Sequence, residues 1–117
     1  MQRNVEWYLA HGFDRPMAEY FAAGRRRIIS VKPNRDFTLT LGFDNGETRL
    51  YDCKAFLKPN TVFEPFMRYE NFSRVYLDDL HSVCWDIDPE IDSNVNWNNK
   101  VDLSPDSCYV ESRPIEG

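Results

Sequence analysis

A β-hairpin pattern in the first half of the chain constrains the fold more than any other feature. In DFTLTLGFDNGETRLYD, residues 36–52, every second residue before the turn is apolar: Phe37, Leu39, Leu41 and Phe43. Asp44-Asn45-Gly46 is a tight-turn sequence, and the return strand runs from Thr48 to Cys53. Such alternation is typical of antiparallel strands with one buried face. The chain is therefore expected to fold around a sheet.

The rest of the chain supplies further strands for this sheet. RIISV, residues 27–31, has the alternation of a strand. SRVYLDD and HSVCWDI, residues 73–87, form a second hairpin that turns at Asp78-Asp79-Leu80. Between the hairpins, TVFEPFM is expected to form a short helical turn or an irregular segment at one edge of the sheet. The sequence therefore predicts an antiparallel sheet of about four or five strands built from two hairpins.

Short helices are expected at both ends of the chain. The first covers residues 4–10, and the second, in DRPMAEYFAAG, has an N-capping Asp, an early Pro and a C-terminal Gly. Met17, Tyr20 and Phe21 share one face of the second helix and should face the core. Ser104 caps a short C-terminal helix. The prediction is a single α+β domain over residues 1–117, in which a helical segment, 1–24, packs on the sheet of a core at 28–110.

Charge and cysteine content narrow the class of protein. Residues 1–35 carry seven basic and three acidic groups, whereas residues 36–117 carry seven basic and sixteen acidic ones. Three unpatterned cysteines suit a reducing compartment better than a disulfide scaffold. The chain has neither a signal-peptide pattern nor an apolar run of membrane-spanning length. We therefore expect a cytoplasmic protein that is not embedded in a membrane.

The acidic residues concentrate in one stretch. Between Val75 and Asn99 there is no Lys or Arg, but there are six carboxylates: Asp78, Asp79, Asp86, Asp88, Glu90 and Asp92. DIDPEIDSN, residues 86–94, has an oxygen ligand at every second position, yet Ile91 and Trp97 stand where an EF-hand needs Gly and Glu. An extended segment would place its four carboxylates along one face. Three interpretations remain: a solvated turn, a protein-contact surface, or a cation site formed by Asp86, Asp88, Glu90 and Asp92.

Other candidate sites have weaker signals. His81 and Cys84 are too few for a zinc site, and buried free cysteine is the ordinary explanation for all three cysteines. Arg25, Arg26 and Arg27 can contact a phosphate or an acidic partner, although a helix C-terminus also explains the run. Trp97 lies in the polar stretch NVNWNNK, as a plug for the loop or as an exposed interface anchor. No catalytic motif is present, so we expect neither an enzyme nor a cofactor.

Several stretches resemble a known family, the small bacterial proteins called domain of unknown function 2442. They are VKPNRDFTLTLGFDNGETRLYD, VFEPF, NFSRVYLDD with CWD, and VDLSPDSCY, between about Ile28 and Tyr109. The resemblance implies a small α+β domain, often encoded in arrangements similar to toxin–antitoxin pairs, without established catalytic residues. Residues 1–24 and the long IDPEIDSNVNWNNK segment depart from that pattern. In size and charge the chain is also similar to anti-CRISPR inhibitors of phages and mobile elements.

The leading hypothesis is a non-catalytic interaction protein that inhibits or neutralises a partner with a basic surface. A small toxin or a Cas9-type nuclease fits, because a dense negative surface can imitate the charge of DNA. The expected contact residues are Asp78, Asp79, Asp86, Asp88, Glu90, Asp92 and Trp97. The alternatives are a nucleic-acid-associated regulator that uses Arg25–Arg27, although direct nucleic-acid binding fits the acidic chain poorly, and a metal-binding domain that uses residues 86–94. Homodimerisation through a sheet edge is compatible with each.

Overall fold

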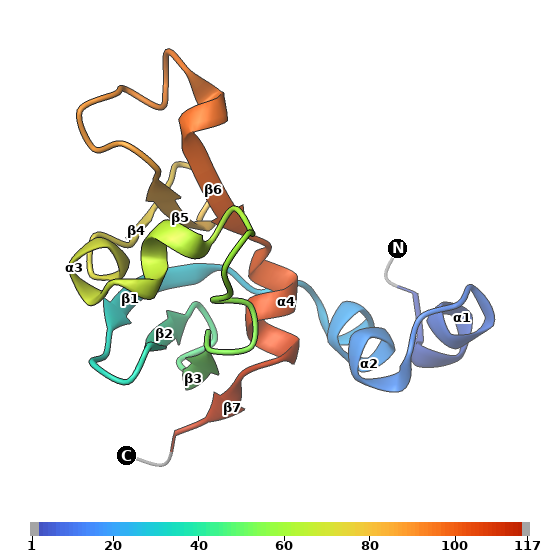
Figure 1. Cartoon of the computed structure of the whole chain (residues 1–117). Coiled ribbons are helices and arrows are strands. Elements are labelled where there is room, and N and C mark those ends of the chain that lie inside the picture. The colour runs from blue at the N-terminus through green and yellow to red at the C-terminus, as the bar shows by residue number, and fades with distance from the viewer. Residues whose placement is uncertain (1–2, 116–117) are drawn as a thin grey trace.

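Two antiparallel sheets and several short helices make up the fold in the computed structural model, which describes residues 3–115 (Figure 1). The larger sheet has the strand order β1-β2-β3-β7, with β1 Ile28–Pro33, β2 Thr38–Phe43, β3 Thr48–Asp52 and β7 Arg113–Pro114. The smaller has the order β4-β5-β6, with β4 Tyr76–Leu77, β5 Val83–Asp86 and β6 Lys100–Leu103. The predicted α+β class is confirmed, but the two hairpins lie in separate sheets. The short β4 contacts β1 without joining its ladder.

The hairpin that dominates the sequence pattern forms β2 and β3. Leu39 pairs with Tyr51 and Leu41 with Arg49, and the leucines are fully buried. Gly46 has a φ of 87°, a left-handed conformation that suits glycine. The turn closes because the amide of Glu47 donates to the side chain of Asn45 at 3.0 Å. Alternation and turn chemistry therefore act together to set this register.

The hydrophobic core joins both sheets to the helices above them. Trp85 of β5 lies at its centre, fully buried against Phe66 and Phe72, with its indole N–H donating to the Phe72 carbonyl at 2.9 Å. Those phenylalanines come from η1, Glu64–Met67, and α3, Tyr69–Phe72. The three cysteines, Cys53, Cys84 and Cys108, are free and buried, as the sequence predicted. Within residues 3–115, no helix is both long enough and apolar enough to span a membrane.

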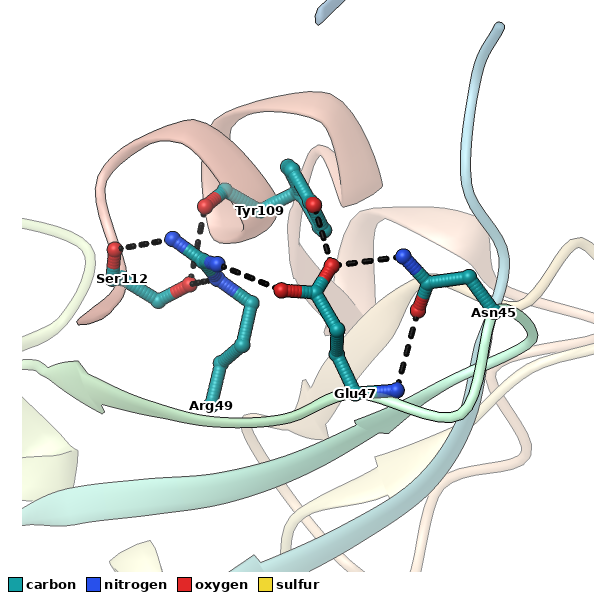
Figure 2. Close-up of polar contacts among 5 residues, drawn as sticks. All are labelled: Asn45, Glu47, Arg49, Tyr109 and Ser112. Atoms are coloured by element: carbon teal, nitrogen blue, oxygen red, sulfur yellow. Dashed lines mark hydrogen bonds and ion pairs between the residues drawn. The ribbon is translucent and has the colours of Figure 1, made fainter. Parts of the chain in front are cut away.

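The helix α4, Pro105–Val110, is tied to the large sheet by a polar cluster (Figure 2). The guanidinium of Arg49 donates to the hydroxyl and carbonyl of Ser112 at 2.8 and 2.7 Å. It also pairs with Glu47 at 3.2 Å and lies 4.4 Å from the ring centre of Tyr109. Tyr109 in turn donates its hydroxyl to Glu47. The cluster thus links β3 to the C-terminal turn of α4.

The N-terminal helices differ from the prediction in where they pack. α1, Val5–Ala10, lies against α2, Arg15–Ala23, and α2 contacts α4 instead of a sheet face (Figure 1). The expected N-cap is present, because Asp14 accepts the amide of Met17 at 2.9 Å. On α2 only Ala18 and Tyr20 are buried, so Met17 and Phe21 do not reach the core. The reason is that α4 offers a buried carboxylate and an aromatic ring beside the sheet, and α2 docks there.

Candidate functional site

The chain between β5 and β6 forms a projecting arm, defined here as residues 87–99 (Figure 1). The arm begins and ends at the pair Asp86 and Lys100, and the Ile87 amide donates to the Asn99 carbonyl at 2.7 Å. η2, Trp97–Asn99, forms its last turn. The radius of gyration is 15.4 Å, compared with about 13 Å expected for a compact domain of this length. The arm and the α1–α2 pair both contribute to this extended shape.

One buried side chain, Asn99, organises the arm. Its Oδ1 accepts the amide of Asp88 at 2.9 Å. Its Nδ2 lies within 3.1 Å of three acceptors, which are the carbonyls of Asp88 and Ile91 and the hydroxyl of Ser93. The side-chain amide of Asn99 therefore supplies hydrogen bonds that paired strands would otherwise provide in this loop. The arm is folded before any partner arrives.

The carboxylates of the arm do not lie along an extended strand. Asp88 accepts the amide of Glu90 at 2.9 Å, and Asp92 accepts the amide of Asn94 at 2.9 Å. Both side chains act as formers of successive turns, which is the role that Asp has in many loops. The segment therefore does not take the extended geometry that would place four carboxylates along one face, because the backbone turns between them.

Asp86 holds the arm against the smaller sheet. Its Oδ1 accepts the hydroxyl of Tyr76 at 2.7 Å and the hydroxyl of Ser93 at 2.6 Å. Burial, together with this hydrogen bond, raises the pKa of Tyr76, so the phenol stays a proton donor. Asp86 thus joins β4, β5 and the arm, and its carboxylate is already engaged within the protein.

Asp78 has a similar structural role in the turn between β4 and β5. Its Oδ1 accepts the amides of Leu80 and Ser82, and its Oδ2 pairs with the Lys100 ammonium at 3.0 Å. Burial opposes the charged form of Asp78, but the bonds from Ser82 and Lys100 outweigh it and lower the pKa. The same ion pair raises the pKa of Lys100. The acidic stretch therefore receives a cation that lies just beyond it in the sequence.

The arm and the β4–β5 turn enclose an acidic hollow of about 730 Å³. Its carboxylates come from both segments and from the end of β5: Asp78, Asp79, Asp86, Glu90 and Asp92. Lys100 also lines it, whereas Asp88 and Trp97 do not. The carboxylates of Asp79 and Glu90 accept no hydrogen bond and form no ion pair within residues 3–115, so their charges are available to a partner. The structure thus gathers five of the six predicted carboxylates.

The two segments that form this hollow also carry exposed apolar side chains, of which Leu80 and Ile91 line the hollow itself. Trp97 is 77% exposed and Val95 83%, so the tryptophan does not plug the loop. On the neighbouring turn, Leu80 is 80% exposed. Ile87 and Ile91 add two further exposed aliphatic groups to the arm. Exposed large apolar residues beside a concave charged surface are the usual features of a binding site for another protein.

The basic run Arg25–Arg27 lies between α2 and β1. Arg25 binds the carboxylate of Asp106 through two nitrogens, at 2.7 and 3.2 Å. The side chain of Arg26 lines a hollow between α2 and α4, and Arg27 is exposed. Arg25 is therefore engaged with the protein's own carboxylate, and a phosphate contact through Arg26 and Arg27 stays a prediction.

No group of three or more His, Cys, Asp or Glu within residues 3–115 is arranged to hold a metal ion. In and beside the arm, several carboxylates are already engaged in hydrogen bonds. The oxygens of Asp86, Asp88 and Asp92 accept hydrogen bonds from hydroxyl and amide groups of the loop. His81 donates through Nδ1 to the Ile28 carbonyl, 3.0 Å away, and does not pair with Cys84.

The comparisons with known proteins identify a family. A family model described as "Protein of unknown function (DUF2442)" matches residues 28–114. The chain belongs to this family. No curated protein and no solved structure matches the chain significantly. The DUF2442 match includes all seven strands, the arm and α4, whereas α1 and α2 precede it.

The sequence did not reveal the residues that shape this site. Asn99 and Lys100 end the polar stretch NVNWNNK, where no motif marks them, yet Asn99 holds the arm and Lys100 lines the acidic hollow. No motif in the sequence marks Tyr76 or Ser93, although both donate a hydrogen bond to Asp86. The only available signal was position, because Asn99 directly precedes the strand that follows the arm and Lys100 begins that strand.

Proposed function

We propose that this DUF2442 protein is a non-catalytic interaction protein that binds a partner protein through the arm and the β4–β5 turn. The observation that carries the proposal is the exposure of Trp97, Val95 and Leu80 beside the acidic hollow. Trp is enriched among the residues that dominate binding energy at protein interfaces. An arm held by Asn99 supports tight binding, since little ordering entropy is lost on association.

The charge of the hollow indicates what kind of partner it fits. Five carboxylates and a single lysine line it, and the lysine is neutralised by its pair with Asp78. A partner with exposed Lys or Arg side chains is therefore attracted, and this attraction raises the rate of association. A small basic toxin and a nuclease with a DNA-binding cleft both have such a surface. Inhibition follows if the arm occupies that cleft in place of nucleic acid.

The alternative functions have less support. A nucleic-acid-associated regulator needs a broad basic field, and the pairing of Arg25 with Asp106 removes one of its three arginines. A metal-binding loop needs uncommitted oxygens, and three of its four carboxylates already accept hydrogen bonds.

Binding through the arm can be tested by quantitative affinity capture of the tagged chain from a cell extract. The partner is identified from the wild-type chain and then purified for direct titration. We expect the variant Val95→Ser with Trp97→Ser to bind it about 30-fold more weakly, because an interface hot spot contributes about 2 kcal/mol or more. A matched control is Val62→Ser, which changes an exposed apolar residue far from the arm in sequence. Equal binding by the arm variant and the wild type would reject the proposal.

The charge mechanism needs a separate variant. Asp79→Asn with Glu90→Gln removes two charges without breaking an internal bond, whereas changes at Asp86 or Asp78 would disturb the fold. We expect slower association and a weaker dependence on salt, since screened long-range attraction acts mainly on the association rate. Asp44→Asn with Glu64→Gln is the charge-matched control. Unchanged association by the first variant would leave the apolar contacts as the whole basis of binding.

A further inference from the structure

The attachment of the N-terminal helices to the rest of the fold is concentrated on one buried carboxylate. Asp106 of α4 accepts the hydroxyl of Tyr20 at 2.6 Å. It also accepts the guanidinium of Arg25 on both oxygens, at 3.2 and 2.7 Å. The Tyr20 oxygen then accepts the amide of Arg26 at 2.9 Å. These residues are here called the Asp106 latch: Tyr20, Arg25 and Asp106.

The donors of the latch, Tyr20 and Arg25, and its acceptor, Asp106, belong to different parts of the protein. Asp106 lies within residues 28–114, the part that matches the family, whereas Tyr20 and Arg25 lie in the preceding segment. If that segment moved away, Asp106 would lose each hydrogen-bond donor of the latch. Leaving a buried carboxylate without hydrogen-bond donors raises the free energy of the protein. The α4 face therefore favours a hydroxyl and a guanidinium placed as those of Tyr20 and Arg25 are.

Apolar packing between α2 and α4 contributes less to this attachment. Ala18 and Tyr20 are the buried residues of α2, and the ring of Tyr20 lies 5.2 Å from that of Tyr109. A hollow of about 300 Å³ remains between the helices, lined by residues of both, including Pro16, Glu19 and Val110. The contact is therefore only partly filled, and polar recognition at Asp106 sets its specificity.

We propose that the α4 face around Asp106 is a docking site for a short helix and the extended segment that follows it, in which the helix presents a tyrosine and the segment presents an arginine five residues later. α2 and the residues after it occupy this site within the same chain. A partner segment with the same two groups competes for the face and releases α1 and α2 from it. This site is separate from the arm, so the docking proposal does not depend on the proposed function.

The test is binding of a fluorescein-labelled peptide of residues 13–27 to the full-length chain, followed by fluorescence anisotropy. In the wild-type chain, the chain's own α2 competes with the peptide. The variant Tyr20→Phe with Arg25→Gln weakens that competitor and leaves residues 28–114 unchanged. We expect it to bind the peptide at least about tenfold more tightly than the wild type does, because charge-assisted hydrogen bonds are lost only from the competitor. Glu6→Gln, an exposed change on α1 away from the α4 face, is the control and should behave like the wild type.

Two further measurements separate specific docking from general attraction of a basic peptide to an acidic protein. The variant Tyr20→Phe with Arg25→Gln is called the opened variant. Adding Asp106→Asn to it should abolish its gain in peptide affinity over the wild type. A peptide with Tyr20→Phe and Arg25→Lys keeps its net charge, and it should bind the opened variant at least about tenfold more weakly. The peptide comparison needs no change in the core, so it stands even if Asp106→Asn impairs folding. Equal affinity for the wild-type and opened chains, or for the two peptides, would overturn the proposal.

Discussion

Replacing Asn99 with Ala is expected to unfold the arm while the core stays intact. The side chain has four polar neighbours, all of them in the arm, and it is the only buried residue between residues 87 and 99. Its loss removes a donor from two carbonyls and an acceptor from the Asp88 amide. Those groups then need water, which they reach only when the arm opens.

The magnitude follows from the number of hydrogen bonds. Nδ2 has two hydrogens for its three neighbouring acceptors, and Oδ1 accepts one amide, so three bonds are lost at one time. At about 1 kcal/mol for each bond, the arm loses about 3 kcal/mol, and its opening equilibrium rises roughly 100-fold. Core strands are expected to keep their stability, because regions of a protein open with different free energies.

Native-state hydrogen exchange measures this opening directly. The amides of Asp88 and Ile91 should exchange roughly 100-fold faster in Asn99→Ala, whereas those of Leu41 and Tyr51 in the large sheet should not change. Asn98→Ala is the matched control, since it removes the same side chain from a neighbouring exposed position. Unchanged exchange in the arm, or equal acceleration in arm and core, would refute the assignment of Asn99 as the residue that holds the arm.

Three further predictions concern the core and the large sheet. The hydrogen bond from Tyr109 lowers the pKa of Glu47 from its ordinary value of 4.5. Its stabilisation is therefore present above that value and lost as the pH falls toward the lower folded pKa; urea unfolding should show a flatter acid dependence in Glu47→Gln. Trp85→Ala should lower the free energy of unfolding by about 3–5 kcal/mol, since the residue is fully buried. Gly46→Ala should cost about 1–2 kcal/mol in thermal unfolding because of its positive φ.

The candidate site was predictable as a set of residues but not as a geometry. Counting charges was sufficient to find the acidic stretch, and the absence of the EF-hand pattern was readable position by position. The shape of the arm was not, because Asp88 and Asp92 bind backbone amides of the loop itself, and the direction of each turn depends on those bonds. Lys100 was outside the acidic stretch in sequence but lies against Asp78 in space.

Local features of this protein were determined by the sequence itself. The β2–β3 hairpin, the N-caps at Asp14 and Ser104, and the three buried cysteines depend on neighbouring residues and on hydrophobicity. Such interactions span two to four positions, so they can be read along the chain.

The tertiary structure decided how these elements meet. Asp78 and Lys100 are 22 positions apart, and Tyr20 and Asp106 are 86 apart. The first contact neutralises one carboxylate of the acidic hollow. The second places α2 on α4 and not on a sheet face. The physical reason is that a polar side chain binds whichever group the folded backbone brings within about 3 Å, and no local pattern in the chain records that partner.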